Sequence, residues 1–228
     1  MTPKQIEFWR GVLDQLPLQL GVVPFGIVFG ILALASGLTP LQSILMSSIL
    51  FGGASQVVFA QLVSLGTAPI VTFSSVAVIN LRHMLYSASL AKYLISLPLG
   101  WRLGLGYLLT DEAFAVSVKR FEEAPDLARY HLLGSGLTLW LCWQLATIAG
   151  VLLGAEIPAS WNLDFAIPLT FIAIVLPSLR KVPHLAAALS SGLVAVFAQS
   201  LPHNIWIIVA GLTGIVVGGF LSREEGTK

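Results

Sequence analysis

The residues of this chain that can do chemistry stand inside long apolar sequence. Residues 15–81 contain no Asp, Glu, Lys or Arg, and Arg82 and His83 follow directly. An ionisable group at bilayer depth costs roughly 2.5–3.5 kcal/mol on insertion scales. A chain that keeps one there usually uses it to handle an ion, a proton or a polar solute. We therefore predict that residues 80–87 mark the functional site.

Two neighbouring helix faces carry the polar side chains of this stretch. Asn80, His83 and Ser87 are spaced i, i+3, i+7 and fall on one face, and Arg82 and Tyr86 share the adjacent face. Arg82 stays charged at any accessible pH, so it needs a carboxylate partner, a carboxylate solute or a wet cavity. His83 can exchange a proton near neutral pH. The structural alternatives are a snorkelling or purely ion-paired Arg82 and a satisfied buried imidazole at His83.

A second polar cluster interrupts the uncharged run. Gly52 and Gly53 are adjacent, and Ser55 and Gln56 follow them. Each glycine costs a helix interior roughly 1 kcal/mol relative to alanine. A helix broken at mid-membrane frees backbone N–H and C=O groups that can bind a solute. The alternative is that the glycines permit close helix packing while the polar pair bonds a neighbouring helix.

A third cluster, Thr110, Asp111 and Glu112, lies near the centre of a later apolar stretch. Two adjacent carboxylates in a low dielectric repel each other, which favours keeping a proton on one of them and suits proton coupling. Pairing of Arg82 with Asp111 or Glu112 is the natural intramembrane ion pair. The alternative is that this stretch does not span the membrane and the three residues lie at a surface.

The composition predicts a membrane protein built from helices. Hydrophobic residues make up 56% of the chain, charged residues 10%, and the mean hydropathy is +0.88. Soluble domains carry about 25% charged residues. The apolar runs are longer than the alternating segments of about 10 residues typical of a transmembrane β-barrel. A net charge of +1 without a basic patch argues against nucleic-acid binding.

The predicted fold is all-α, a polytopic membrane helical bundle forming a single domain over residues 1–228. An amphipathic stretch at 1–14 is expected at the membrane interface, a charged loop at 119–129, and a polar tail at 222–228. The eight expected hydrophobic segments, two of them broken or re-entrant, are at about residues 17–36, 41–65, 68–92, 100–118, 131–153, 161–178, 183–200 and 204–221.

The distribution of Lys and Arg places both termini in the cytoplasm. With eight crossings, only Lys92 and Arg102 fall outside, against the rule that cytoplasmic loops carry the positive charge. If the segments at 41–65 and 100–118 are re-entrant, six crossings remain and both residues move inside. Both topologies stay open.

A weak internal similarity is consistent with an inverted repeat. A shift of 143 residues aligns Pro40 with Pro183 and Gln56 with Gln199. Under eight crossings the two segments concerned run in opposite directions, which is the common plan of secondary transporters. Chance is the alternative, because the matching residue types are frequent in this chain.

Five short motifs in order resemble the AzlC family, over about residues 15–220. They are Pro24-Phe25-Gly26, Gly53-Ala54-Ser55-Gln56, Asn80-Leu81-Arg82-His83 with Leu85-Tyr86-Ser87, Thr110-Asp111-Glu112 with Phe114-Ala115, and Leu163-Asp164-Phe165-Ala166 with Pro168. The resemblance implies an inner-membrane, multi-pass transporter that exports branched-chain amino acids (leucine, isoleucine, valine or analogues) together with a small AzlD-like membrane subunit. It implies no enzyme activity.

The three clusters suit such a zwitterionic substrate. Arg82, or a helix N-terminus at the broken segment 53–56, can hold a carboxylate, and Asp111 or Glu112 can hold an ammonium group. Asp164 and Phe165 are a second tier of candidates; Phe51, Phe59 and Phe165 are candidates for an apolar pocket. We expect proton coupling through Asp111, Glu112 or His83. We expect no cofactor, and no residues have the spacing of a metal site. A channel or a structural subunit is the alternative, and an intramembrane hydrolase using Ser55 and His83 is disfavoured.

Overall fold

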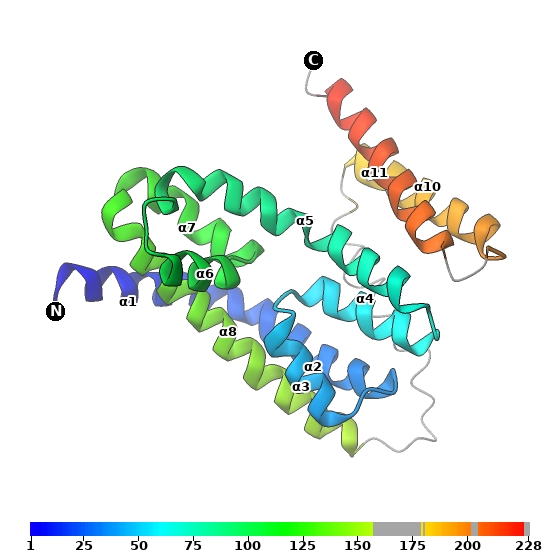
Figure 1. Cartoon of the computed structure of the whole chain (residues 1–228), viewed down its shortest axis with the longest axis horizontal. Helices are drawn as coiled ribbons and strands as arrows, with labels where there is room; N and C mark the ends of the chain where they lie inside the picture. Colours follow the sequence, from blue (N-terminus) through cyan, green and yellow to red (C-terminus); the bar gives the residue numbers. More distant parts are fainter. Residues whose placement is uncertain (157–178, 180, 202–204, 226–228) are drawn as a thin grey trace. The chain divides into compact units, whose positions relative to one another are not determined.

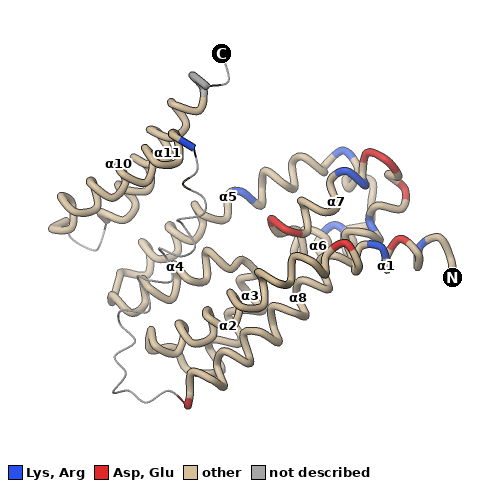
Figure 2. Tube along the Cα trace, turned by 180° about the vertical axis from the view of Figure 1, so that it is seen from behind, with Lys and Arg blue, Asp and Glu red and all other residues tan. Residues whose placement is uncertain are grey.

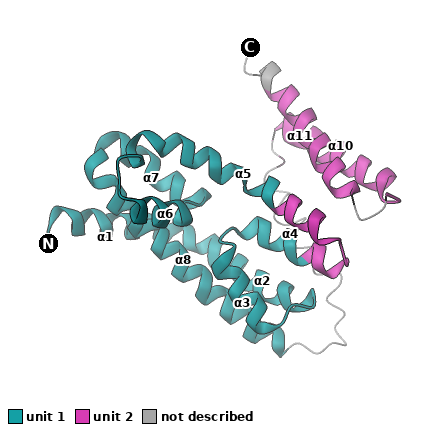
Figure 3. Ribbon diagram, in the orientation of Figure 1, with its two compact units in different colours: residues 1–60, 77–158 teal, residues 61–76, 159–228 magenta. Residues whose placement is uncertain are grey.

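The computed structural model describes residues 1–156, 179, 181–201 and 205–225, and all regular structure in this part of the chain is helical (Figure 1). The expected all-α class is therefore confirmed for these residues. The chain divides into two compact units (Figure 3): unit 1 holds Met1–Ala60 and Ala77–Pro158, and unit 2 holds Gln61–Val76 and Ala159–Lys228. The single domain expected over the whole chain stays a prediction.

The N-terminal helices run into one another without a loop. Helix α1 (Pro3–Gln15) starts with a capping box between Thr2 and Gln5, and a short 3₁₀ turn, η1 (Leu16–Leu18), leads into α2 (Gln19–Ala35). The combined stretch Pro3–Ala35 and helix α8 (Pro125–Ala155) are the two helices of the described residues that are long and apolar enough to cross a membrane. The expected segments at 17–36 and 131–153 are therefore helices.

Glycines let α1 and α2 pack backbone to backbone against α8. A Cβ added at Gly11 would lie 2.1 Å from the His131 carbonyl oxygen, and one at Gly134 would lie 2.1 Å from that of Phe8. At the other end of α8, a Cβ at Gly150 would lie 2.1 Å from the Ile27 carbonyl oxygen. Small residues at helix interfaces permit such close approach. The expected interfacial stretch at 1–14 is thus a helix packed along α8, and its depth in the membrane stays a prediction.

The second expected segment is two helices with a break between them. Helix α3 (Pro40–Ile49) begins with a capping box of Thr39 and Gln42, and α4 (Gly53–Ser64) follows after three non-helical residues. Leu50 ends α3 with φ −105° and ψ 78°. The break at residues 50–52 includes Gly52 and ends directly before Gly53, as the adjacent glycines predict.

The fourth expected segment is broken as well. Helix α5 (Pro69–Leu94) accounts for the third segment, and α6 (Leu99–Leu108) and α7 (Asp111–Glu123) share the fourth. Leu109, with ψ 80°, and an extended Thr110, with ψ −178°, separate α6 from α7. Asp111 and Glu112 therefore stand in the first turn of a helix, where its dipole favours negative charge.

The charged loop expected at 119–129 is wrong. Helix α7 continues through Glu123, Ala124 alone turns the chain at φ −145°, and Pro125 starts α8. Proline fits the first turn of a helix because no N–H is needed there. Ion pairs of Glu123 with Lys119 and Arg120, four and three residues earlier, also stabilise the helical form.

Helices α6 and α7 double back along α8. At the start of α6, the Trp101 ring lies 5.4 Å from that of Tyr130, and beyond the middle of α7, Ser117 Oγ lies 3.1 Å from His131 Nδ1. A Cβ at Gly136, further along α8, would lie 2.7 Å from Leu108 Cβ at the end of α6. Both ends of this segment therefore lie beside the same end of α8, which favours the re-entrant alternative for residues 100–118.

The charges of unit 1 gather at that end of α8. Figure 2 shows most of the charged residues of unit 1 on α1, α7 and the neighbouring ends of α5, α6 and α8, while α2, α3 and α4 carry none. The exceptions are Arg82 in the middle of α5 and Glu156 at the opposite end of α8. The Tyr93 ring near the end of α5 lies 5.4 Å from that of Phe121, so Lys92 belongs to the same end. Lys92 and Arg102 thus lie on the side of unit 1 that holds Lys4 and Arg129.

In unit 2, helices α10 (Val182–Ala198) and α11 (Trp206–Glu225) pack against each other. A Cβ at Gly218 would lie 3.0 Å from Ala187 Cβ, which shows how closely they approach. These helices account for the expected segments at 183–200 and 204–221; the segment at 161–178 lies outside the described residues. Pro40 and Pro183 both stand in a first helical turn, but α10 is continuous where α3 and α4 are separated. The inverted repeat stays a prediction.

Candidate functional site

The break between α3 and α4 brings a polar group of α4 against α5. Ser55 Oγ lies 2.8 Å from Asn80 Oδ1 and 2.9 Å from the Gly52 carbonyl oxygen, so its hydroxyl has two acceptors within reach. A Cβ added at Gly52 would lie 2.8 Å from Ser55 Oγ and 3.3 Å from both Asn80 Oδ1 and His83 Cε1. Only a residue without a side chain fits here unless the polar groups move. Gly52 therefore keeps the break close to the polar face of α5.

The break between α6 and α7 meets the same turn of α5. Arg82 Nη1 donates a hydrogen bond of 2.5 Å to Asp111 Oδ2, and His83 Nε2 lies 3.8 Å from Asp111 Oδ1. The side chains of Arg82 and Asp111 are 31% and 36% exposed, so the pair is open on one side. A charged pair that remains accessible can exchange its partners for a polar solute.

Aromatic side chains extend this contact along α5. The rings of Tyr86 and Phe114 stack with centroids 4.7 Å apart, and the Tyr86 ring lies 6.1 Å from the His83 ring. This stacking fixes the first turns of α7 against α5. The turn of α5 from Asn80 to Tyr86 therefore contacts both broken segments at once.

Five polar atoms at or next to the breaks are buried and have no hydrogen-bond partner in the described chain: Gln56 Oε1, Arg82 Nε, His83 Nε2, Thr110 Oγ1 and Asp111 Oδ1. An unsatisfied buried polar atom costs roughly 1–3 kcal/mol, so proteins usually supply it with water or a ligand. Three of the five atoms belong to the Arg82, His83 and Asp111 group. This group offers unused donors and an unused carboxylate oxygen within a few ångströms.

Not every predicted residue joins this group. Gly53 faces the core instead, because a Cβ there would lie 2.7 Å from Phe25 Cε1 and 2.9 Å from Trp143 Cη2. Gln56 is fully buried and its Nε2 reaches the Met46 carbonyl oxygen at 3.5 Å, so it joins α3 to α4. Glu112 has no ion pair within the described residues. Asp164 and Phe165 lie outside the described residues.

A hydrogen-bonded network that the sequence did not single out holds the two breaks to α8. Tyr107 at the end of α6 donates to the Ser48 carbonyl oxygen at the end of α3, and Trp140 Nε1 donates to Tyr107 Oη at 2.7 Å. Gln144 Nε2 donates to the Ser47 carbonyl oxygen at 3.0 Å. The sequence offered a signal for Gln144, because it is a single amide side chain within an apolar stretch. The role of Tyr107 was not visible, because its partner is a backbone atom 59 positions away.

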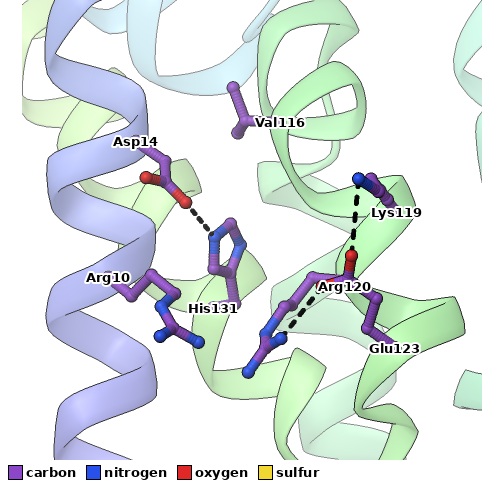
Figure 4. A pocket seen from close by; sticks show the side chains of 7 residues that line it. All are labelled: Arg10, Asp14, Val116, Lys119, Arg120, Glu123 and His131. Atoms are coloured by element: carbon purple, nitrogen blue, oxygen red, sulfur yellow. Dashed lines mark hydrogen bonds and ion pairs between the residues drawn. The ribbon is translucent and has the colours of Figure 1, made fainter.

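A second polar cluster lies at the charged end of unit 1, around a pocket of about 350 Å³ (Figure 4). Figure 4 shows Asp14 of α1 pointing toward His131 of α8, and His131 Nε2 lies 2.9 Å from Asp14 Oδ2. The His131 side chain is 1% exposed, and its other ring nitrogen faces Ser117 Oγ. This cluster joins α1, α7 and α8, and its polar atoms bond to one another.

Arg120 extends this cluster to a buried carboxylate on α1. Its Nη2 donates to Glu7 Oε2 at 2.9 Å and its Nε donates to Glu7 Oε1, a two-pronged contact to a residue that is 3% exposed. Hydrogen bonding from Arg120 holds the pKa of Glu7 below its usual range. No group of three or more His, Cys, Asp or Glu in the described residues is placed to hold a metal ion.

Comparison with known proteins places the chain in a family. The model of the AzlC protein family matches residues 17–157, which contain all eleven first-tier site candidates. The chain belongs to the AzlC family. Relatives of this AzlC chain include the inner membrane protein YgaZ of Escherichia coli K12, 29% identical over 95% of this chain and 90% of that protein. An uncharacterized membrane protein of Archaeoglobus fulgidus is 32% identical over 95% of this chain and 96% of its own length. No solved structure matches the chain.

Family membership confirms the resemblance seen in the motifs and makes this chain a membrane protein. The name of the bacterial relative fixes an inner membrane for that protein. Neither relative's name states a substrate.

Proposed function

We propose that this AzlC-family protein is an inner-membrane secondary transporter that exports branched-chain amino acids. The observation that carries the proposal is the Arg82–Asp111 ion pair at the point where two broken helices contact one turn of α5. Solute sites of secondary transporters are typically built where interrupted helices meet. The partly exposed ion pair, together with neighbouring polar atoms that have no hydrogen-bond partner, can bind the charged groups of a solute.

The groups at the breaks complement both charges of an amino acid. Asp111 Oδ1 has no hydrogen-bond partner and can accept from an ammonium group, while Arg82 Nε is an unused donor for a carboxylate. Because Arg82 and Asp111 already pair with each other, a zwitterion can replace each partner without leaving a net charge behind. Phe51, whose ring lies 5.8 Å from the Tyr107 ring, offers an apolar contact beside the break.

Proton coupling follows from the same group. A carboxylate that pairs with Arg82 in one state and accepts a proton in another changes its affinity for an ammonium group. His83 is the second proton carrier, because its Nε2 faces Asp111 Oδ1 at 3.8 Å. We further propose that a small AzlD-like membrane subunit completes the transporter, and that both termini lie in the cytoplasm.

The test is export of radiolabelled leucine, isoleucine and valine from cells that express the chain with and without the small subunit. Arg82→Ala and Asp111→Asn are each expected to abolish export and resistance to a toxic leucine analogue at normal membrane levels. Full export by both variants would overturn the proposal. Arg102→Ala is the matched control, because Arg102 has no ion pair in the described chain.

A channel or a structural subunit is the competing function. Saturable, proton-dependent flux supports a carrier, whereas flux that rises linearly with concentration supports a channel. Flux that appears only with the small subunit supports a two-chain transporter. An intramembrane hydrolase is disfavoured, because the Ser55 hydroxyl contacts Asn80 and Gly52, and no hydrogen bond to His83 is present in the described chain.

A further inference from the structure

We infer that an anionic phospholipid binds unit 1 in a groove beside α6 and α8, with its phosphate held by Arg129 and Lys4. The groove has a volume of about 440 Å³ and lies between the first turns of α6 and residue 133 of α8. It is separate from the Arg82–Asp111 pair and does not depend on the proposed transport activity. The occupant follows from the apolar lining, the open glycines and the cations beside Trp101.

The lining suits an acyl chain. The groove is lined by Pro98, Gly100, Trp101, Gly104, Leu105 and Leu133, none of which carries a charge. A Cβ added at Gly100 or Gly104 would meet no atom within 4 Å, so the absence of side chains at these positions creates the open space. Leu99 and Leu103 beside it are 63% and 65% exposed, which continues the apolar surface.

A cationic and aromatic cluster adjoins the groove through Trp101, which lines it. The Arg129 guanidinium carbon lies 5.6 Å from the centre of the Trp101 ring and 4.9 Å from that of Tyr130. The Lys4 ammonium lies 5.7 Å from the Tyr130 ring. Tryptophan and tyrosine at the headgroup level, beside lysine and arginine, are typical of a membrane interface.

The charge of this cluster is not neutralised within the described chain. Neither Lys4 nor Arg129 forms an ion pair there, unlike Arg10 and Arg120 on the same side of unit 1. Arg129 Nε is buried and has no hydrogen-bond partner. A phosphate accepts hydrogen bonds from guanidinium groups and from ammonium groups. A phospholipid headgroup can therefore supply the acceptor that Arg129 and Lys4 lack within the described chain. An anionic headgroup fits better than a zwitterionic one, because two positive charges meet it.

The experiment uses the purified full-length protein in detergent, incubated with an equimolar mixture of phosphatidylglycerol and phosphatidylcholine. Native mass spectrometry then counts the retained lipids. We expect the wild type to retain phosphatidylglycerol in roughly 30-fold excess over phosphatidylcholine, because each of the two basic contacts to an anionic lipid is worth about 1 kcal/mol. Lys4→Gln combined with Arg129→Gln should bring that ratio close to one.

The control for charge is Lys92→Gln, because Lys92 stands 4.7 Å over the Tyr93 ring but lines no part of the groove. The groove itself is tested by Gly104→Leu, which fills the open space without a backbone clash and should lower retention of both lipids. Gly21→Leu is its control, because a Cβ there also meets no atom within 4 Å. Thermal unfolding verifies that every variant is folded.

Three results would overturn the inference. They are equal retention of the two lipids by the wild type, a loss after Lys92→Gln as large as after the double substitution, and unchanged retention after Gly104→Leu. If Gly104→Leu instead prevents co-purification of a partner chain while lipid retention stays unchanged, a protein occupies the groove and the inference is wrong.

Discussion

Arg82 on α5 and Asp111 at the start of α7 are joined by a hydrogen bond of 2.5 Å, although 29 positions separate them in the chain. Asn80, two residues before Arg82, meets Ser55 at the other break at 2.8 Å. One turn of α5 thus connects the two interrupted segments of unit 1. In the proposed transporter, this shared turn would transmit a movement of one break to the polar groups at the other.

The first prediction separates a structural ion pair from a substrate site. Either Arg82→Gln or Asp111→Asn alone leaves one charge half-buried and unpaired, which should cost roughly 1–3 kcal/mol of stability. The double variant removes both charges and should regain most of this stability while export stays abolished. Thermal unfolding and amino-acid export, measured on all three variants, provide the comparison. Recovery of export in the double variant would make the pair purely structural.

The second prediction concerns the close approach at Gly52. Gly52→Ala places a methyl group 2.8 Å from Ser55 Oγ and 3.3 Å from Asn80 Oδ1, so these groups must separate. We expect export to fall at least tenfold, with a stability loss of about 1–3 kcal/mol typical of overpacking. Gly21→Ala, where no atom lies within 4 Å, is the matched control and should export normally. Normal export by Gly52→Ala would show that the break does not need this contact.

The third prediction tests the link between the two breaks and α8. Tyr107→Phe removes a hydroxyl that donates to the Ser48 carbonyl oxygen and accepts from Trp140 Nε1. Loss of these two bonds should lower the free energy of unfolding by about 1–3 kcal/mol, since each is worth about 1 kcal/mol. Tyr93→Phe is the control, because Tyr93 makes ring contacts but no hydrogen bond within the described residues. Equal stabilities of the two variants would contradict the role given to Tyr107.

The fourth prediction concerns pH and the carboxylates that bind Arg120. Hydrogen bonds from Arg120 hold the pKa of Glu7 and of Glu123 below the ordinary value of 4.5. A carboxyl group with a lowered folded-state pKa stabilises the fold above its unfolded-state pKa. That contribution is lost as the pH falls through the lowered value. The thermal midpoint of the purified protein should therefore drop as the pH is lowered below about 4.5.

Glu7→Gln should reduce that pH dependence and lower the midpoint at pH 7, because Glu7 is 3% exposed and receives two hydrogen bonds from Arg120. Glu122→Gln changes the net charge equally but removes no ion pair recorded in the described chain, so it is the control. A pH profile that is the same in wild type and Glu7→Gln would show that this contact does not contribute.

The sequence by itself located one of the two breaks, the one beside the glycine pair. Adjacent Gly52 and Gly53 weaken a helix wherever they stand, and the break lies immediately before Gly53. The expected segments at 17–36 and 68–92 lie within about two residues of the ends of α2 and α5, whereas α8 begins at Pro125, six residues before the segment expected at 131–153. The charged stretch after Lys119 was the exception, because local ion pairs and Pro125 make it helical, and polarity alone does not distinguish an exposed helix from a loop.

Only the tertiary structure decided which groups meet. Arg82 needed a carboxylate, but the sequence left Asp111 and Glu112 equivalent. Successive residues of a helix point about 100° apart, so only one of the two can face α5, and the packing of Tyr86 on Phe114 sets that face. The structure likewise separated Gly52, at the polar group, from Gly53 in the core. Such choices depend on how helices distant in the chain pack together, and no local pattern of residues contains that information.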